Sequence, residues 1–389
     1  MEQARRRGVR DRQRQAADRR REAFLQRQSE RRRDAQGLVR GVVAAVHAAD
    51  GRAAAGGEEE AMEEEEAGGG AARPPRKHRG PRVLDQLSRH QLQRHDWLCD
   101  VPSDLASKWL VAARPEGVRC IVVACHGSTV AHERNGRRLA RFPSLLPAGH
   151  KARRQHGVNM ADATILDCIL DREERTFHVI DIMCWRGYDL YNSSCEARLF
   201  TLASRLEETD GIGAQSQYNP YTFAAVPVFP AARLSLEQVY GTPESQLGFA
   251  RDGFLFLHRD GQYDLDQITP LVLVWKDAAT SRFFVEAPQD GRQHAVLRPV
   301  ADGDALQLQT GDEPAVTVAR VPCPPAMEAA LPRFVRVSFA TIDEAALVDV
   351  HVAGNASRRR EYADSWLKIR FQWMARHEPL TIDEVLASG

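Results

Sequence analysis

Three short stretches of the chain place cations and a carboxylate beside glycine turns and aromatic side chains. They are Arg114–Arg119 (RPEGVR), Asp252–Phe256 (DGFLF) and Val274–Lys276 (VWK). Arginine and lysine bind phosphate groups, and a lysine amine that loses its proton can also attack phosphorus as a nucleophile. Each stretch is a weak signal alone, because Asp-Gly pairs mark turns in many proteins. Their order and spacing together favour a nucleotide pocket.

The three stretches resemble, in the same order, motifs of the covalent nucleotidyltransferases, which are the DNA ligases and mRNA capping enzymes. Those motifs read K-x-D-G-x-R, (D/E)-G-x-x-(F/V/I) and W-K, and the first lysine attacks the α-phosphate of a nucleotide. Arg114 holds that position here, and arginine stays protonated at any working pH. None of the five lysines (77, 108, 151, 276 and 368) precedes an x-Asp-Gly. The resemblance therefore implies a pocket for a guanine nucleotide without a covalent step by that route.

Longer blocks resemble the cap-binding domain of the snurportin family. The most specific is Asp181–Gly187 (DIMCWRG). The others are His95–Leu105, His126–Thr129, Arg141–Pro147, Thr164–Cys168, Asp252–His258 and Thr269–Val272. The resemblance covers residues 90–276. Snurportins carry spliceosomal U snRNPs into the nucleus by the trimethylguanosine cap of the U snRNA, and their cap-binding domain has the capping-enzyme fold.

The resemblance implies a set of cap-binding residues. Trp275 would stack on the methylated guanine, and Trp97 would pack against its methyl-bearing side. N7 methylation makes the base cationic, and an indole face is the best aromatic partner for a cation. Arg114, Arg119, Arg134 and His95 match positions close to the cap, where fixed cations suit the triphosphate bridge. One extra residue follows Thr269–Val272 before Trp275, and one step along a strand reverses the facing of a side chain.

The N-terminal segment is rich in arginine, with 14 arginines and six acids among its first 40 residues. Sparse apolar residues predict that it cannot fold alone, yet it has good helix formers and therefore needs an acidic partner. It resembles the importin-β-binding helix of the snurportin family. The residues implied in that contact are Arg19, Arg20, Arg21, Phe24, Leu25, Arg27, Arg31, Arg32 and Arg33. The rival interpretation is direct binding to nucleic acid, against which the interspersed acids argue.

The domain division follows from changes in composition along the chain. We expect an importin-β-binding helical segment at 1–46, a flexible linker rich in Glu, Gly and Pro at 47–90, a cap-binding domain at 91–280, and a small β-rich module at 281–389. Many strand-like runs and few helices predict an α+β fold with antiparallel sheets, and the resemblance implies that this fold is of the capping-enzyme and ligase type. One of the expected strands is Ala197–Leu202. The last module has no assigned role, and the OB-like domain of capping enzymes is one candidate.

Composition also limits the other function classes. The seven cysteines form no C-x-x-C pair and no zinc-like spacing with histidine, so we expect reduced thiols and neither metal nor cofactor. No apolar run is long enough to span a membrane. The prediction is a non-enzymatic adaptor that shuttles between cytoplasm and nucleus, with U snRNP and importin β as partners. An exportin is a further family partner, although residues 1–10 do not resemble the family's export segment.

Two alternatives stay open at this point. One is a nucleotidyltransferase of the capping or ligase class whose nucleophile is a displaced lysine, with Lys276 as the candidate. The other is a general cap-binding or RNA-binding protein without a transport role. Formation of a covalent protein–nucleotide adduct separates the first of these from the adaptor.

Overall fold

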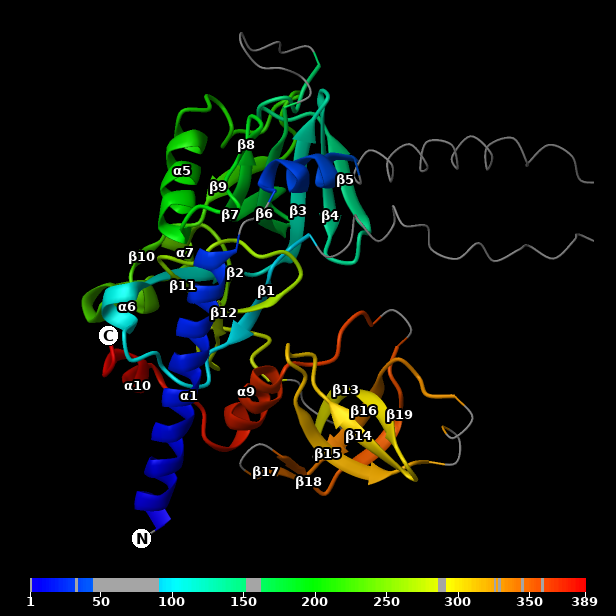
Figure 1. The fold of residues 1–389 in the computed structure, drawn as a ribbon. Helices are drawn as coiled ribbons and strands as arrows, with labels where there is room; N and C mark the ends of the chain where they lie inside the picture. Colours follow the sequence, from blue (N-terminus) through cyan, green and yellow to red (C-terminus); the bar gives the residue numbers. More distant parts are fainter. Residues whose placement is uncertain are drawn as a thin grey trace, which may run out of the picture.

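The computed structural model describes residues 2–31, 34–44, 91–151, 162–285, 292–324, 327, 330–343, 346–357 and 360–389, with side chains described from residue 11. The predicted linker at 47–90 and the predicted contact residues Arg32 and Arg33 lie outside these ranges. The described chain forms two packed sheets, a separate β-rich module, and an N-terminal helix that runs along them (Figure 1).

The centre of the fold is a pair of sheets that confirm the predicted α+β class with antiparallel pairing. The first sheet has the order β5 (Arg138–Phe142), β4 (Ser128–Glu133), β3 (Val118–Cys125), β6 (Thr164–Asp171), β7 (Thr176–Trp185) and β8 (Tyr188–Asp189), with β9 (Thr222–Ala225) beside β7. The second has the order β1 (Arg94–Trp97), β12 (Ile268–Trp275), β11 (Arg251–His258), β2 (Trp109–Pro115) and β10 (Phe229–Pro230). All strand pairs in the two sheets are antiparallel except β1–β12 and β7–β9.

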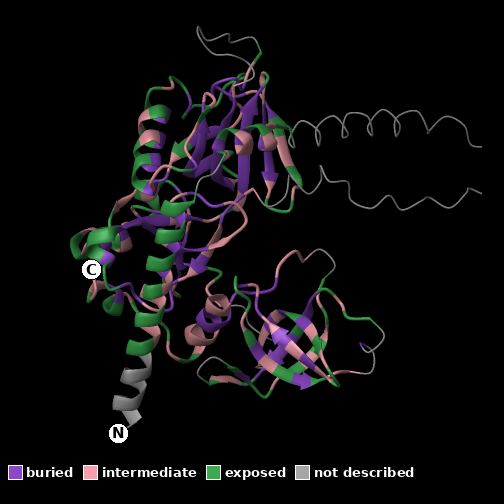
Figure 2. Ribbon diagram, in the orientation of Figure 1, coloured by how far each residue is buried: buried purple, intermediate pink, exposed green. Residues whose placement is uncertain are grey.

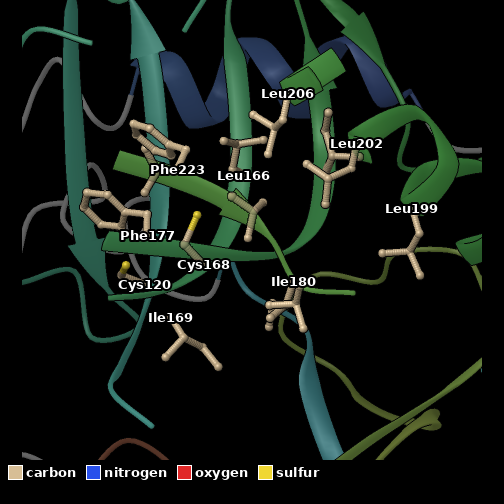
Figure 3. Packing of buried hydrophobic residues seen from close by; sticks show 14 of the residues in the cluster. Cys120, Leu166, Cys168, Ile169, Phe177, Ile180, Leu199, Leu202, Leu206 and Phe223 are labelled. Carbon is tan, nitrogen blue, oxygen red and sulfur yellow. The ribbon is translucent and has the colours of Figure 1, made fainter. Parts of the chain in front are cut away.

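A hydrophobic core lies between the sheets, and α5 (Cys195–Glu207) closes one side of it (Figure 3). Leu199, Leu202 and Leu206 recur at helical spacing and are buried against Phe177 and Phe223. The expected strand at Ala197–Leu202 is therefore wrong. The Ser194 hydroxyl caps the helix by accepting from Ala197 N at 3.3 Å, and the apolar residues follow the 3.6-residue period rather than alternation.

A second core covers the opposite face of the five-stranded sheet. Trp109, Phe254, Phe256 and Trp275 point into it. The helices that close it are α6 (Arg233–Gly241), α9 (Trp366–His377) and α10 (Ile382–Leu386), while α4 (Leu105–Lys108) and α7 (Glu244–Leu247) are single turns at its edge. Although the sequence placed both C-terminal helices in the final module, α10 packs on the second core, and α9 packs on that core and also, through Ile369, on the core of the β-rich module.

The β-rich module has its own core around Leu297, Leu308, Val335 and Phe339. Its sheet has the order β15 (Thr317–Pro322), β14 (Ala305–Gln309), β13 (Gln293–Asp302), β16 (Val335–Phe339) and β19 (His351–Asn355), with a hairpin of β17 (Thr341–Asp343) and β18 (Ala346–Val348). The strands in this part of the chain are short, and all of their pairings are antiparallel.

The arginine-rich segment forms one long helix, α1 (Glu2–Glu30), and this helix docks on the same chain (Figures 1 and 2). Phe24 is 8% exposed. Arg20 pairs with the fully buried Asp96 on β1 at 2.8 Å, and the Gln28 amide donates to Asp264 at 2.6 Å. Arg31 also pairs with Asp264, at 3.3 Å. The acidic groups that this segment requires are therefore supplied within the chain.

Candidate functional site

A cavity of about 590 Å³ opens where β1, β2, β3 and β12 meet the segment that precedes α9. Seven lysines and arginines line it, against three acids. The lining residues are Arg94, His95, Trp97, Arg114, Val118, Arg119, Glu133, Arg134, Asn135, Ile268, Val274, Lys276, Arg360, Glu361, Tyr362, Ala363, Asp364, Ser365 and Lys368. The excess of cations in a concave site favours a ligand with several negative charges.

The three motif stretches meet at one buried carboxylate, Asp252, which holds two of the cations that line the cavity. Asp252 accepts a hydrogen bond from Lys276 Nζ at 2.5 Å and pairs with Arg114 through its other oxygen. Gly253, with φ +84°, makes this approach possible, because a Cβ there would lie 2.4 Å from the Trp275 carbonyl oxygen. Burial lowers the pKa of Lys276, although Asp252 opposes the shift. Both cations are thus fixed in position at the cavity wall.

Arg119 is held by a second buried carboxylate. Its Nε and Nη2 donate to the two oxygens of Asp167 at 3.0 and 2.6 Å, and Asp167 is fully buried. The Tyr263 hydroxyl donates to the same carboxylate at 2.8 Å. This bidentate pair fixes the plane of the guanidinium at the base of the cavity, where it can direct a ligand but is partly neutralised.

His95 and Trp97 both lie on β1 and both line the cavity, as the two-residue period of a strand requires. The intervening Asp96 points away, to Arg20 of α1. Burial holds the pKa of His95 well below its ordinary value, and the charges of Arg119, Arg114 and Arg134 add to the effect. The imidazole is therefore neutral at physiological pH. Phe371 packs against the Trp97 indole, with ring centroids 4.6 Å apart.

Trp275 requires a correction, because the structure places it in the second core and not in the cavity. Its ring is 1% exposed, it stacks on Phe254 with centroids 5.5 Å apart, and its Nε1 donates to the Leu380 carbonyl at 3.2 Å. Its neighbours on β12, Val274 and Lys276, line the cavity instead. The pairing of β11 with β12 is regular from Val272 to Trp275, so no bulge there absorbs the extra residue and the indole faces the opposite side of the sheet.

Arg134 lines the cavity, in a setting that includes residues that the sequence did not reveal. Its guanidinium lies over the Tyr362 ring at 5.1 Å, and that of Arg94 lies over the same ring at 4.1 Å. Tyr362 comes from the segment before α9, outside the predicted cap-binding domain. Aromatic and basic residues in a loop carry no periodic signal, so only the folded arrangement reveals this wall of the cavity.

Within the described ranges, no cluster of three or more His, Cys, Asp or Glu side chains has the arrangement of a metal site. Among the helices of those same ranges, none has the length and apolar character needed to cross a membrane.

The part of the chain that forms most of the cavity matches a known protein family. Residues 91–277 match the model of one protein family, described as Snurportin1, m3G cap-binding domain, where m3G is trimethylguanosine. This part of the chain is snurportin-like. The matched residues include every strand of the two packed sheets and all of the motif residues that gather at the cavity. The snurportin-like part ends shortly after β12, so the β-rich module and the segment with Tyr362 lie beyond it.

Solved structures similar to this chain include two ligases. A mycobacterial DNA ligase D complexed with ATP and MES shares 14% identity, with 70% of this chain and 98% of that chain covered and a TM-score of 0.32. The ligase domain from M. tuberculosis ligase D shares 15% identity, with coverage of 68% and 94% and a TM-score of 0.32. Similarity at this level carries no inference about activity.

Proposed function

We propose that this chain is a non-enzymatic nuclear import adaptor that binds the trimethylguanosine cap of U snRNAs and links the capped particle to importin β. The observation that carries the proposal is the position of Arg114. A cation that cannot act as a nucleophile stands at the head of a nucleotide pocket, inside a region that matches an m3G cap-binding domain. The pocket can bind a nucleotide but has no lysine at the position from which the ligases attack.

The proposed cap contacts use the residues that line the cavity. Trp97 offers an indole surface to the methylated, cationic base, and its carbon surface suits the N2 methyl groups. Arg114, Lys276 and Arg134 face the region where the triphosphate bridge would lie. A neutral His95 can accept or donate a hydrogen bond without adding to the repulsion among these cations.

Titration of the full chain with cap analogues, followed by quenching of tryptophan fluorescence, tests the proposal. The trimethylated analogue should bind more tightly than the monomethylated one, because the N2 methyl groups add apolar surface and remove a donor that would need a partner. Equal affinity for the two analogues would remove the assignment to U snRNPs. It would favour the general cap-binding alternative.

The enzymatic alternative rests on Lys276, whose pKa is lowered by burial. Its amine donates a hydrogen bond to Asp252 at 2.5 Å, and this carboxylate opposes the lowering of the pKa. Incubation with labelled GTP or ATP and a divalent cation, followed by denaturing electrophoresis, should therefore leave the protein unlabelled. A labelled band that is absent in Lys276→Arg would overturn the adaptor proposal.

The importin β contact is proposed for α1 and the residue that follows it. The described residues that would take part are Arg19, Arg20, Arg21, Phe24, Leu25 and Arg27 of α1, together with Arg31. Several of these are engaged within the chain, including Phe24 and the pairs of Arg20 with Asp96 and Arg31 with Asp264. Importin β would therefore have to displace α1 from the body. The apparent affinity for importin β would then be the intrinsic affinity multiplied by the fraction of chains in which α1 is free of the body.

Substitution of Asp264 tests this displacement without changing α1. Asp264→Ala removes the acceptor of Gln28 and Arg31, and we expect importin β to bind about 5- to 10-fold more tightly, in line with loss of a buried charge-assisted hydrogen bond. Calorimetric titration measures the change. Asp260→Ala is the matched control, because that carboxylate is 61% exposed and pairs with Lys108 at 3.7 Å. Deletion of residues 1–40 should abolish binding, and unchanged affinity in Asp264→Ala would contradict the displacement.

A further inference from the structure

The wall of the cavity continues beyond the part of the chain that matches the cap-binding family. The match ends at residue 277, whereas Arg360, Tyr362, Asp364 and Lys368 line the cavity from the C-terminal side. These residues belong to the short segment between β19 and α9 and to the first turn of α9. A role in ligand binding would explain why a module with its own core packs at the mouth of the pocket.

The segment 360–368 is anchored at several points. The Tyr362 hydroxyl donates to Asp266, which lies in the loop before β12 of the cap-binding domain. The backbone of Asp364 pairs with Val296 on β13, and its carboxylate accepts from Val296 N at 2.8 Å. The Ser365 hydroxyl then caps α9 by accepting from Lys368 N at 3.2 Å. The segment is therefore tied to both the cap-binding domain and the β-rich module, and it is held at a fixed position over the cavity.

The charges of this wall are arranged for an anion. Asp364 is a single carboxylate shared by two cations, since it pairs with Arg360 and accepts from Lys368 Nζ at 2.8 Å. Facing them, Arg94 and Arg134 lie over the Tyr362 ring, which fixes guanidinium groups through a cation–π contact without neutralising them. The cations on the two sides of the cavity thus outnumber the carboxylates that hold them, and each is held in place before a ligand arrives.

We propose that the segment 360–368 is a second wall of the RNA site and binds the phosphates that join the methylated guanosine to the RNA, together with the first phosphates of the RNA chain. Arg360 and Lys368 contact the triphosphate bridge and the first RNA phosphates, while Tyr362 positions Arg94 and Arg134 for the same anions. This inference rests on the proposed function, since it takes a capped RNA as the ligand of the cavity. It assigns to the C-terminal part of the chain a share in cap recognition.

The test compares two ligands on the full chain, an m3G-capped pentanucleotide RNA and the m3G nucleoside without phosphates. Arg360→Glu should weaken binding of the capped RNA about 5- to 20-fold, because it removes a charge-assisted hydrogen bond and adds repulsion, and it should leave nucleoside binding unchanged. The slope of log K against log salt should become shallower by about 0.7 for each single-strand phosphate that the variant no longer neutralises. Tyr362→Ala should have a similar effect, and Tyr362→Phe, which keeps the ring, a smaller one.

Arg320→Glu is the matched control. Arg320 lies in the same module on β15, is 62% exposed, and pairs with Asp302 at 3.0 Å away from the cavity. Thermal unfolding of each variant shows that the fold is kept. The inference is overturned if the wild-type protein binds both ligands and if Arg360→Glu and Tyr362→Ala bind each ligand as tightly as the wild type does. The proposed function would then stand. Equal weakening for nucleoside and capped RNA would also overturn the phosphate assignment, and a wild-type protein that binds neither ligand would overturn both.

Discussion

Replacing Trp97 with Ala should weaken binding of a trimethylated cap analogue by about 5- to 150-fold, which corresponds to the 1–3 kcal/mol of a base–aromatic stack. Trp97 is the only tryptophan among the described residues that line the cavity, and the packing of Phe371 against it holds the indole in place. Direct binding of a labelled analogue, read by fluorescence anisotropy, avoids reliance on the tryptophan that has been removed. Trp97→Phe should retain part of the affinity.

Trp275→Phe provides the matched comparison for Trp97→Ala. Since the Trp275 ring stacks on Phe254 in the second core, this variant should bind the analogue with close to wild-type affinity and show only a lower stability. If Trp275→Phe lost the cap while Trp97→Ala kept it, the assignment of the stacking residue would be reversed. The same result would show that β12 pairs with its neighbouring strands in another register.

Replacing Arg198 with Ala should lower the free energy of unfolding by about 3–5 kcal/mol, because it leaves a buried carboxylate without its partner. Arg198 on α5 is 1% exposed and donates from Nε and Nη2 to the two oxygens of Asp181 on β7, both at 2.8 Å. Its Nη1 also donates to the carbonyl oxygens of Ser193 and Gly261 at 2.7 and 2.9 Å. One side chain thus joins the helix to the seven-stranded sheet and to the loop before β12.

Urea unfolding followed by circular dichroism measures this loss of stability. Arg205→Ala on the same helix is the control, because Arg205 is 47% exposed and its pair with Glu208 is a surface ion pair that contributes about 0–1 kcal/mol. Similar unfolding midpoints for Arg198→Ala and Arg205→Ala would contradict the structural role of the Arg198–Asp181 pair.

The sequence alone was sufficient for the fold class and for much of the pocket. The stretches around Arg114, Asp252 and Lys276 were predicted to form one pocket, and they meet because β2, β11 and β12 are adjacent strands of one sheet. His95, Trp97, Arg119 and Arg134 also line the cavity. The facing of side chains along one strand depends on residues that are close together in the sequence, so it can be recognised from the sequence alone.

Two features could not be predicted in this way. The facing of Trp275 depends on one residue of register between β12 and its neighbours, which a resemblance with an insertion cannot specify. The wall formed by Tyr362 depends on a contact with Asp266, 96 residues away, that leaves no local pattern. The docking of α1 belongs to the same class, since Gln28 meets Asp264 across 236 positions. These three features concern tertiary contacts, whereas the expected strand at Ala197–Leu202, which is part of α5, is an error of secondary structure.

The cysteines of the core give the protein a set of internal chemical probes. Six of the seven are buried. Burial raises the pKa of Cys120 and of Cys168 between the sheets, and it raises the pKa of Cys195 on α5 to about 12. Because the thiolate is the species that reacts, these thiols stay inert toward alkylating reagents while the sheets are closed. Modification of Cys120 or Cys168 therefore records each separation of the two sheets. Its rate, compared with that of the half-buried Cys323, would report how often the cap-binding domain opens and how far a bound cap suppresses that opening.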